Sequence, residues 1–76
     1  MNTKEIMTHI DKKLATGMMI RIKAKYSNCT GNEWLSQFRT IVMLTLTSGG
    51  IDVKTISEST ANSVLTKLEK KAGIYL

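Results

Sequence analysis

Residues Met18 to Asn28 read MMIRIKAKYSN, a stretch in which apolar and cationic side chains alternate. On a strand, successive side chains point to opposite faces, so the apolar residues would share one face and the cations the other. The apolar face would hold Ile20, Ile22, Ala24 and Tyr26, and the opposite face Arg21, Lys23 and Lys25. A helix would spread the lysines around its circumference. The alternation therefore predicts a half-buried strand, which needs a second strand to pair its backbone groups.

The partner strand is expected in the stretch RTIVMLTLTSGGIDVKTIS, residues 39–57. Residues Thr40 to Thr47 are rich in β-branched side chains, which favour strands. Gly49 and Gly50 form a tight-turn signal, and Ile51 to Ile56 alternates again. These features predict a β-hairpin.

A helical interpretation competes with the hairpin for the same residues. Residues 30–33 form a capping-box pattern, and apolar residues then follow at helical spacing up to the glycine pair, which indicates one helix over residues 33–48. The prediction adopted combines the two signals as a short helix over residues 33–38 and a strand from Arg39. That choice supplies the partner that the first strand needs.

A helix is also expected near the N-terminus. Asn2 and Glu5 have the spacing of a capping box, and apolar residues at a spacing of four follow them. The helix is predicted to run from Thr3 to Ala15, with Gly17 as its left-handed stop.

The last predicted helix is capped by Ser59, presents an apolar face from Ala61 to Ala72 and ends at Gly73. The resulting order is helix, strand, short helix or loop, β-hairpin, helix. This order predicts a single small α+β domain over residues 1–76, with a three-stranded antiparallel sheet and helices on one face. The alternative is a mostly α fold, similar to winged-helix or helix-turn-helix proteins.

The composition, with 42% apolar and 22% charged residues in 76, is that of one small globular domain. Cys29 is the only cysteine and His9 the only histidine, which excludes an internal disulfide and a zinc site built from several cysteines and histidines. The sequence contains no apolar run long enough for a membrane span and no signal-peptide pattern at its start. A cytoplasmic protein without metal, cofactor or membrane partner is expected.

The sequence lacks the groupings that catalysis requires. His9 has only Glu5 and Asp11 as nearby carboxylates, and Glu5 at a spacing of four indicates a surface pair. Cys29 lies in a polar loop, and neither glycine-rich phosphate-binding motif occurs. A non-catalytic binding protein is therefore predicted.

The charge distribution points to nucleic acid as the ligand. The net charge is +5, and residues 12–32 carry five cations and no acid. Cations two residues apart on a strand stand about 6 to 7 Å apart, close to the spacing of phosphates along a nucleic-acid strand. The alternative is that lysines only keep an exposed strand soluble. The predicted site, which would contact the backbone of DNA or RNA, comprises Arg21, Lys23, Lys25, Lys12, Lys13 and Arg39.

The phrase TANSVLTKLEKKAGI, residues 60–74, resembles the end of a winged-helix recognition helix. The resemblance covers under a quarter of the chain. It implies a helix-turn-helix, with one helix from Asp52 to Glu58, a turn at residues 59–60 and a second helix from Ala61 to Ala72. The residues facing a groove of DNA would then be Asn62, Ser63 and Lys67.

Protein binding is the alternative function. A short chain with five methionines and an apolar hairpin is expected to expose more apolar surface than it buries. Such a surface suits an inhibitor or adaptor of the phage or mobile-element type, or a homodimer. The methionines are Met1, Met7, Met18, Met19 and Met43.

Overall fold

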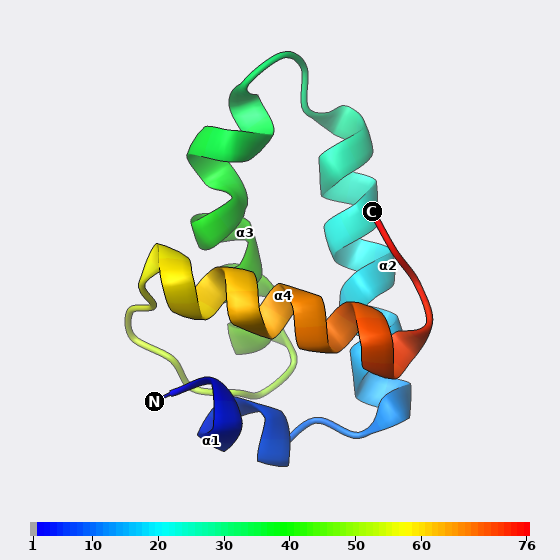
Figure 1. Cartoon of the computed structure of the whole chain (residues 1–76), viewed down its shortest axis with the longest axis vertical. Helices are drawn as coiled ribbons and strands as arrows, with labels where there is room; N and C mark the ends of the chain where they lie inside the picture. Colours follow the sequence, from blue (N-terminus) through cyan, green and yellow to red (C-terminus); the bar gives the residue numbers. More distant parts are fainter. Residues whose placement is uncertain (1) are drawn as a thin grey trace.

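A computed structural model describes residues 2–76 of the protein as four α-helices joined by loops (Figure 1). The helices are α1 (Thr3–Thr8), α2 (Lys12–Asn28), α3 (Glu33–Ser48) and α4 (Glu58–Ala72). Across the residues described, no strand forms. The predicted three-stranded α+β fold is therefore wrong, and the mostly α alternative is confirmed.

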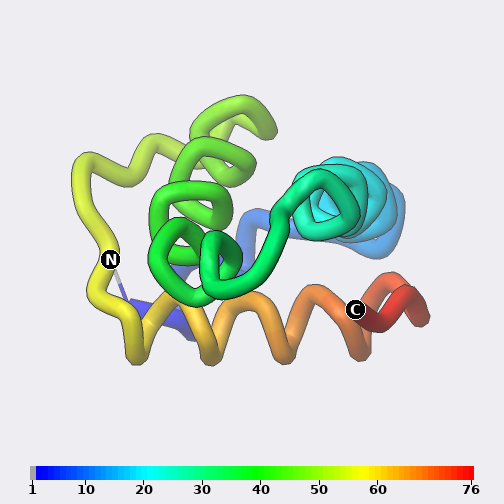
Figure 2. The backbone as a smooth tube through the Cα atoms, turned by 90° about the horizontal axis from the view of Figure 1, so that it is seen from above, coloured from blue at the N-terminus to red at the C-terminus, as the bar shows by residue number. Residues whose placement is uncertain are grey.

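The helices α2 and α3 run antiparallel as a hairpin, and α4 crosses this pair (Figure 1). Seen from above, α4 lies along one side of the pair (Figure 2). The helix α1 packs against α4 at the open end of the hairpin (Figure 1). The molecule measures 33 × 24 × 18 Å.

The core lies where α4 meets the other three helices. Each helix contributes apolar residues, and the loop between α3 and α4 adds three more that are buried at every second or third position. The buried members are Ile6, Ile10, Ala15, Met18, Met19, Ile22, Val42, Leu46, Ile51, Val53, Ile56, Ala61, Val64, Leu65 and Leu68.

The stretch predicted as a strand forms most of α2. The adjacent residues Met18 and Met19 are both fully buried, which a strand cannot do with one covered face. Ile20, which would have faced the core of a sheet, is 59% exposed. Burial thus follows the helical period over residues 15–22.

The start of α2 explains why the N-terminal helix is shorter than expected. The Asn2 capping box is confirmed, with the Asn2 side chain accepting from the Glu5 amide at 2.8 Å. The first helix ends at Thr8, however. The Asp11 carboxylate then accepts from the Leu14 amide at 2.8 Å and caps a second helix. Gly17, predicted as a stop, lies inside that second helix.

The segment predicted to change from helix to strand at Arg39 is one continuous helix, α3. Two of its three threonines donate their hydroxyls to the carbonyl four residues earlier, Thr45 to Ile41 at 2.7 Å and Thr47 to Met43 at 3.0 Å. The glycine pair ends this helix instead of turning a hairpin. Gly50 has a φ of 89°, and the Ile51 amide donates to the Leu46 carbonyl at 2.9 Å.

The cap of the last helix lies two residues earlier than predicted, at Ser57, whose hydroxyl accepts from the Thr60 amide at 3.1 Å. Its left-handed end at Gly73 is confirmed, with a φ of 71°. Residues 52–57 form no helix. The helix pair implied for residues 52–72 is therefore wrong, and a loop leads directly into α4.

The outer end of the α2–α3 hairpin is joined by aromatic contacts. The Tyr26 and Trp34 rings meet edge to face with centroids 5.3 Å apart, and Phe38 lies 6.1 Å from Trp34. Tyr26 remains 43% exposed, since α4 crosses the hairpin nearer its other end (Figure 1). These rings replace the cross-strand contacts expected in a sheet.

Replacing Gly17 or Gly73 with alanine should change the free energy of unfolding in opposite directions. Gly17→Ala is expected to raise the free energy of unfolding by about 0.5–1 kcal/mol, because Gly17 lies inside α2 and an added Cβ meets nothing within 4 Å. Gly73→Ala is expected to lower it by about 1 kcal/mol, because the φ of 71° strains any Cβ. Urea unfolding followed by circular dichroism measures both, and a destabilising Gly17→Ala contradicts the helical placement.

The Tyr26–Trp34 contact should be measurable as a coupling free energy. A double-mutant cycle with Tyr26→Leu and Trp34→Leu is expected to give about 0.5–1.5 kcal/mol of coupling, because the rings meet edge to face. Urea denaturation of the four proteins yields the value. Additive effects of the two substitutions would show that the hairpin ends do not meet in this way.

Candidate nucleic-acid interface

The helix α4 has a buried side and an open side along its whole length. Ala61, Val64, Leu65 and Leu68 face the core. Because α4 lies at one edge of the molecule, its opposite side is open to solvent (Figure 2). The α4 outer face is defined by Ser59, Asn62, Ser63, Thr66, Lys67 and Lys70, all of which are exposed.

The α4 outer face carries only hydroxyl, amide and ammonium groups. Hydroxyls and amides both donate and accept hydrogen bonds, and ammonium groups only donate. The Thr66 hydroxyl donates to the Asn62 carbonyl at 3.0 Å, so toward a ligand its oxygen can act only as an acceptor. These groups are the ones that contact phosphates and base edges in nucleic-acid complexes.

The two acidic residues of α4 lie at one edge of this face, because at about 100° per residue Glu69 lies about 20° and Glu58 about 40° from Asn62. Glu58 lies in the first turn, where a carboxylate is favoured by the helix dipole. Glu69 is half-buried, and its carboxylate accepts from the Leu76 amide at 3.0 Å, which holds it toward the C-terminal tail. The cations at the C-terminal end of α4 are therefore not offset by an adjacent acid on the same face.

The helix α1 adds a further cation beside α4. Lys4 and Lys67 line a shallow depression between the two helices, together with Met7 and Thr8. Lys71, in the last turn of α4, is also exposed. The surface around the α4 outer face is consequently basic.

The cationic face predicted from residues 18–28 does not form, because a helix separates its members. At about 100° per residue, Arg21 and Lys25 lie about 40° apart on α2, whereas Lys23 lies about 160° from each. Lys12 lies about 20° from Lys23 and hence on the same side as Lys23. Lys13 lies about 80° from Arg21, between the two groups.

The structure thus brings only part of the predicted site together. Arg21 and Lys25 line one depression with residues of α3, and Lys13 and Arg21 line a neighbouring one. Lys12, Lys23 and Arg39 line neither of these depressions. All six predicted residues are exposed.

The α4 outer face was visible in the sequence only in part. Asn62, Ser63 and Lys67 follow from the winged-helix resemblance, and they do lie on the exposed side of α4. Ser59 was assigned to the cap and Lys70 to the dipole of the helix end. The sequence feature that could have identified these residues as one surface is the absence of any acid from Ser59 to Leu68.

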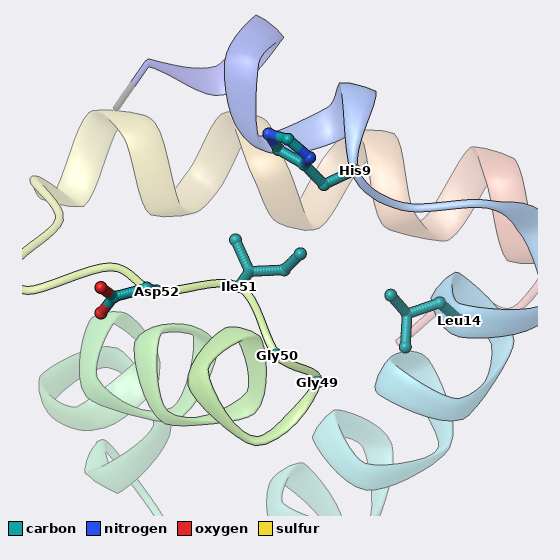
Figure 3. A pocket seen from close by; sticks show the side chains of 6 residues that line it. All are labelled: His9, Leu14, Gly49, Gly50, Ile51 and Asp52. Carbon is teal, nitrogen blue, oxygen red and sulfur yellow. The ribbon is translucent and has the colours of Figure 1, made fainter.

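The single histidine lines a different pocket, between α1, the start of α2 and the Gly49–Gly50 turn (Figure 3). In it, Ile51 points toward His9, whereas the Asp52 carboxylate points away from both (Figure 3). The expected surface pair of His9 with Glu5 is replaced by the hydrogen bond between Glu5 and the Asn2 amide. The pocket therefore does not hold a histidine oriented by a carboxylate.

The part of the chain that the structure describes offers neither a group of metal ligands nor a membrane-spanning helix. Among residues 2–76, no three histidine, cysteine, aspartate or glutamate side chains lie close enough together to hold a metal ion. None of the helices in the described part of the chain is long and apolar enough to cross a bilayer.

The methionines do not form the exposed surface expected of a protein-binding adaptor. Met18 and Met19 are fully buried, and Met7 and Met43 are half-buried against the core. Met1 lies outside the described residues. The methionines therefore fill the core, where their flexible side chains suit irregular gaps between crossing helices.

Comparison with protein-family models, with characterised proteins and with solved structures finds no match to this chain.

Proposed function

We propose that the chain is a small nucleic-acid-binding protein with a regulatory or accessory role, which binds duplex DNA through the α4 outer face. The observation that carries this proposal is the open side of α4, which presents hydroxyl, amide and ammonium groups, with Glu58 at its start and the Glu69 carboxylate held by the C-terminal tail. No covalent chemistry is part of the proposed role.

The dimensions of α4 suit the major groove of DNA. A helix of 15 residues is about 22 Å long and about 10–12 Å wide with its side chains. The major groove of B-form DNA is about 12 Å wide and admits such a helix, whereas the deep, narrow major groove of duplex RNA does not. The proposal therefore names duplex DNA rather than duplex RNA.

The side chains of the face divide naturally into two roles. Lys67 and Lys70 of the face, together with Lys71 beside it, are suited to phosphates, which fix the position of a protein on DNA. Asn62 and Ser63, nearer its middle, are suited to base edges, and asparagine pairs with adenine through two hydrogen bonds. The net charge of +5 favours association with a polyanion over long range.

Binding to a labelled DNA duplex of about two helical turns should weaken steeply as salt rises. Three phosphate contacts predict a slope of log K against log salt of about −2.7, since each contact contributes about −0.9. Lys67→Ala with Lys70→Ala should reduce the slope to about −0.9. Fluorescence anisotropy between about 50 and 200 mM salt provides the measurement.

The matched control removes two cations from elsewhere on the molecule. Arg21→Ala with Lys25→Ala lowers the net charge by the same amount but leaves α4 intact, and is expected to keep the slope near that of the unmodified chain. The proposal fails if no salt-dependent binding is found. It also fails if the two double variants lose affinity equally, or if duplex RNA binds as tightly as duplex DNA.

A further inference from the structure

A groove with an apolar floor and a cationic rim runs along α2. Its deeper part has a volume of about 160 Å³ and lies between Arg21 and Lys25 of α2 and Ile41, Leu44, Thr45 and Ser48 of α3. A second depression of about 410 Å³ continues along α2, where it is lined by Asp11, Lys13, Leu14, Gly17 and Met18 as well as Arg21. Arg21 lines both parts, so they form one continuous surface, called the α2 groove below.

The α2 groove faces away from α4. Its lining residues Arg21, Lys25, Leu44 and Ser48 are exposed, whereas the faces of α2 and α3 that pack against α4 are buried. Figure 2 shows α4 on one side of the hairpin and the other side uncovered. A ligand in the α2 groove would therefore leave the α4 outer face free.

The floor of the groove requires an apolar ligand group. Leu44 is 57% exposed and Ile41 is half-buried in the same part of the groove, and Leu14 is half-buried in the second depression. The one buried polar residue there, Thr45, already donates to the Ile41 carbonyl at 2.7 Å. Covering this floor with apolar side chains would remove apolar surface from water without stranding a polar group.

The rim requires acidic ligand groups. Lys13, Arg21 and Lys25 span 12 residue steps of α2, about 18 Å along its axis. The nearest carboxylate, Asp11, accepts from the Leu14 amide at 2.8 Å as the cap of α2. Asp11 lines one end of the second depression and no other acid among residues 2–76 lines the groove, so three cations outnumber one carboxylate along it.

Together these features fit an amphipathic helix better than a nucleic acid. The residues lining the groove include no aromatic ring on which bases could stack. A phosphate backbone also has no apolar group that could cover the exposed Leu44 side chain. A helix laid between two helices places an apolar ridge in the groove and charged residues along its edges. Acids one and two turns apart on such a helix match the spacings from Arg21 to Lys25 and from Lys13 to Arg21.

We propose that the α2 groove docks an acidic amphipathic helix of a partner protein. Its leucine-type side chains cover Leu44 and Ile41, and its carboxylates pair with Lys13, Arg21 and Lys25. This inference goes beyond DNA binding, because it assigns a second macromolecule to a separate face. The chain would then connect a protein partner to DNA.

The probe is a designed, fluorescein-labelled helical peptide of about 14 residues, about 21 Å long. It carries leucines along one stripe and glutamates on both sides of that stripe. One matched peptide replaces the glutamates with lysines, and another replaces the leucines with serines. We expect the acidic amphipathic peptide to bind at least about tenfold more tightly than either, because binding needs both the rim and the floor.

Variants of the full chain then locate the site. Arg21→Glu with Lys25→Glu, and separately Leu44→Gln, are expected to weaken peptide binding at least about tenfold. Lys67→Glu with Lys70→Glu makes the same change in net charge on α4 and is expected to change binding less than about threefold. All substituted residues are exposed, so circular dichroism should report an unchanged fold.

Three outcomes overturn the inference. The first is equal loss of peptide binding in the two charge-reversal variants, and the second is binding that does not depend on Leu44 or on the peptide's leucines. The third is displacement of the peptide by a DNA duplex whose own affinity falls in Arg21→Glu with Lys25→Glu, which would make the groove a nucleic-acid surface. Loss of DNA binding in the α4 variants alone leaves the inference intact.

Discussion

The packing of α2 against α4 is the interaction on which the other parts of the structure depend. Met18, Met19 and Ile22 of α2 and Val64 and Leu68 of α4 are all fully buried. Burial of one such side chain contributes about 1.5–3 kcal/mol. A domain of this size buries only about 60% of its unfolded surface, so it depends heavily on a few contacts of this kind. Two adjacent methionines are both buried here because they lie on a helix, whereas a strand with one covered face would bury only one of them.

The helical conformation of α2 also decides where the charges lie. On a strand, three cations of residues 18–28 would share one face. On α2, Lys23 lies nearly opposite Arg21 and Lys25, and only the latter two line one groove with α3. The proposed DNA surface lies instead on α4, where Glu58 is at the start of the helix and the Glu69 carboxylate is held by the C-terminal tail. The proposed DNA surface and the proposed protein groove thus occupy different sides of the hairpin.

The local signals at helix ends were sufficient to predict the capping box of α1 and the glycine stop of α4. The conformation of residues 18–28 could not be predicted in this way, because short apolar repeats fit both a period of two and a period of 3.6. Ile20 and Ala24 are apolar yet exposed, so the alternation did not report burial. The predicted strand over residues 18–28 required a partner strand. For that reason a strand from Arg39 was also predicted, although the helical spacing from residue 33 to Ser48 was the correct signal.

The candidate sites were predictable to different degrees. The residues of the α4 outer face lie on one helix, so the polar, acid-free sequence from Ser59 to Leu68 contains most of the information. The α2 groove depends on how α3 is oriented against α2, which brings Leu44 beside Arg21 across more than 20 residues of sequence. No local pattern in the chain encodes that pairing.

The most direct test of the account is the conformation of residues 18–28 in solution, measured by backbone NMR chemical shifts. A continuous α2 predicts positive Cα secondary shifts from Lys12 to Asn28 and sequential amide contacts throughout. Negative Cα secondary shifts over residues 18–28, with cross-strand contacts to residues 39–47, would contradict the account, because both proposed surfaces depend on the helical placement of α2 and α3.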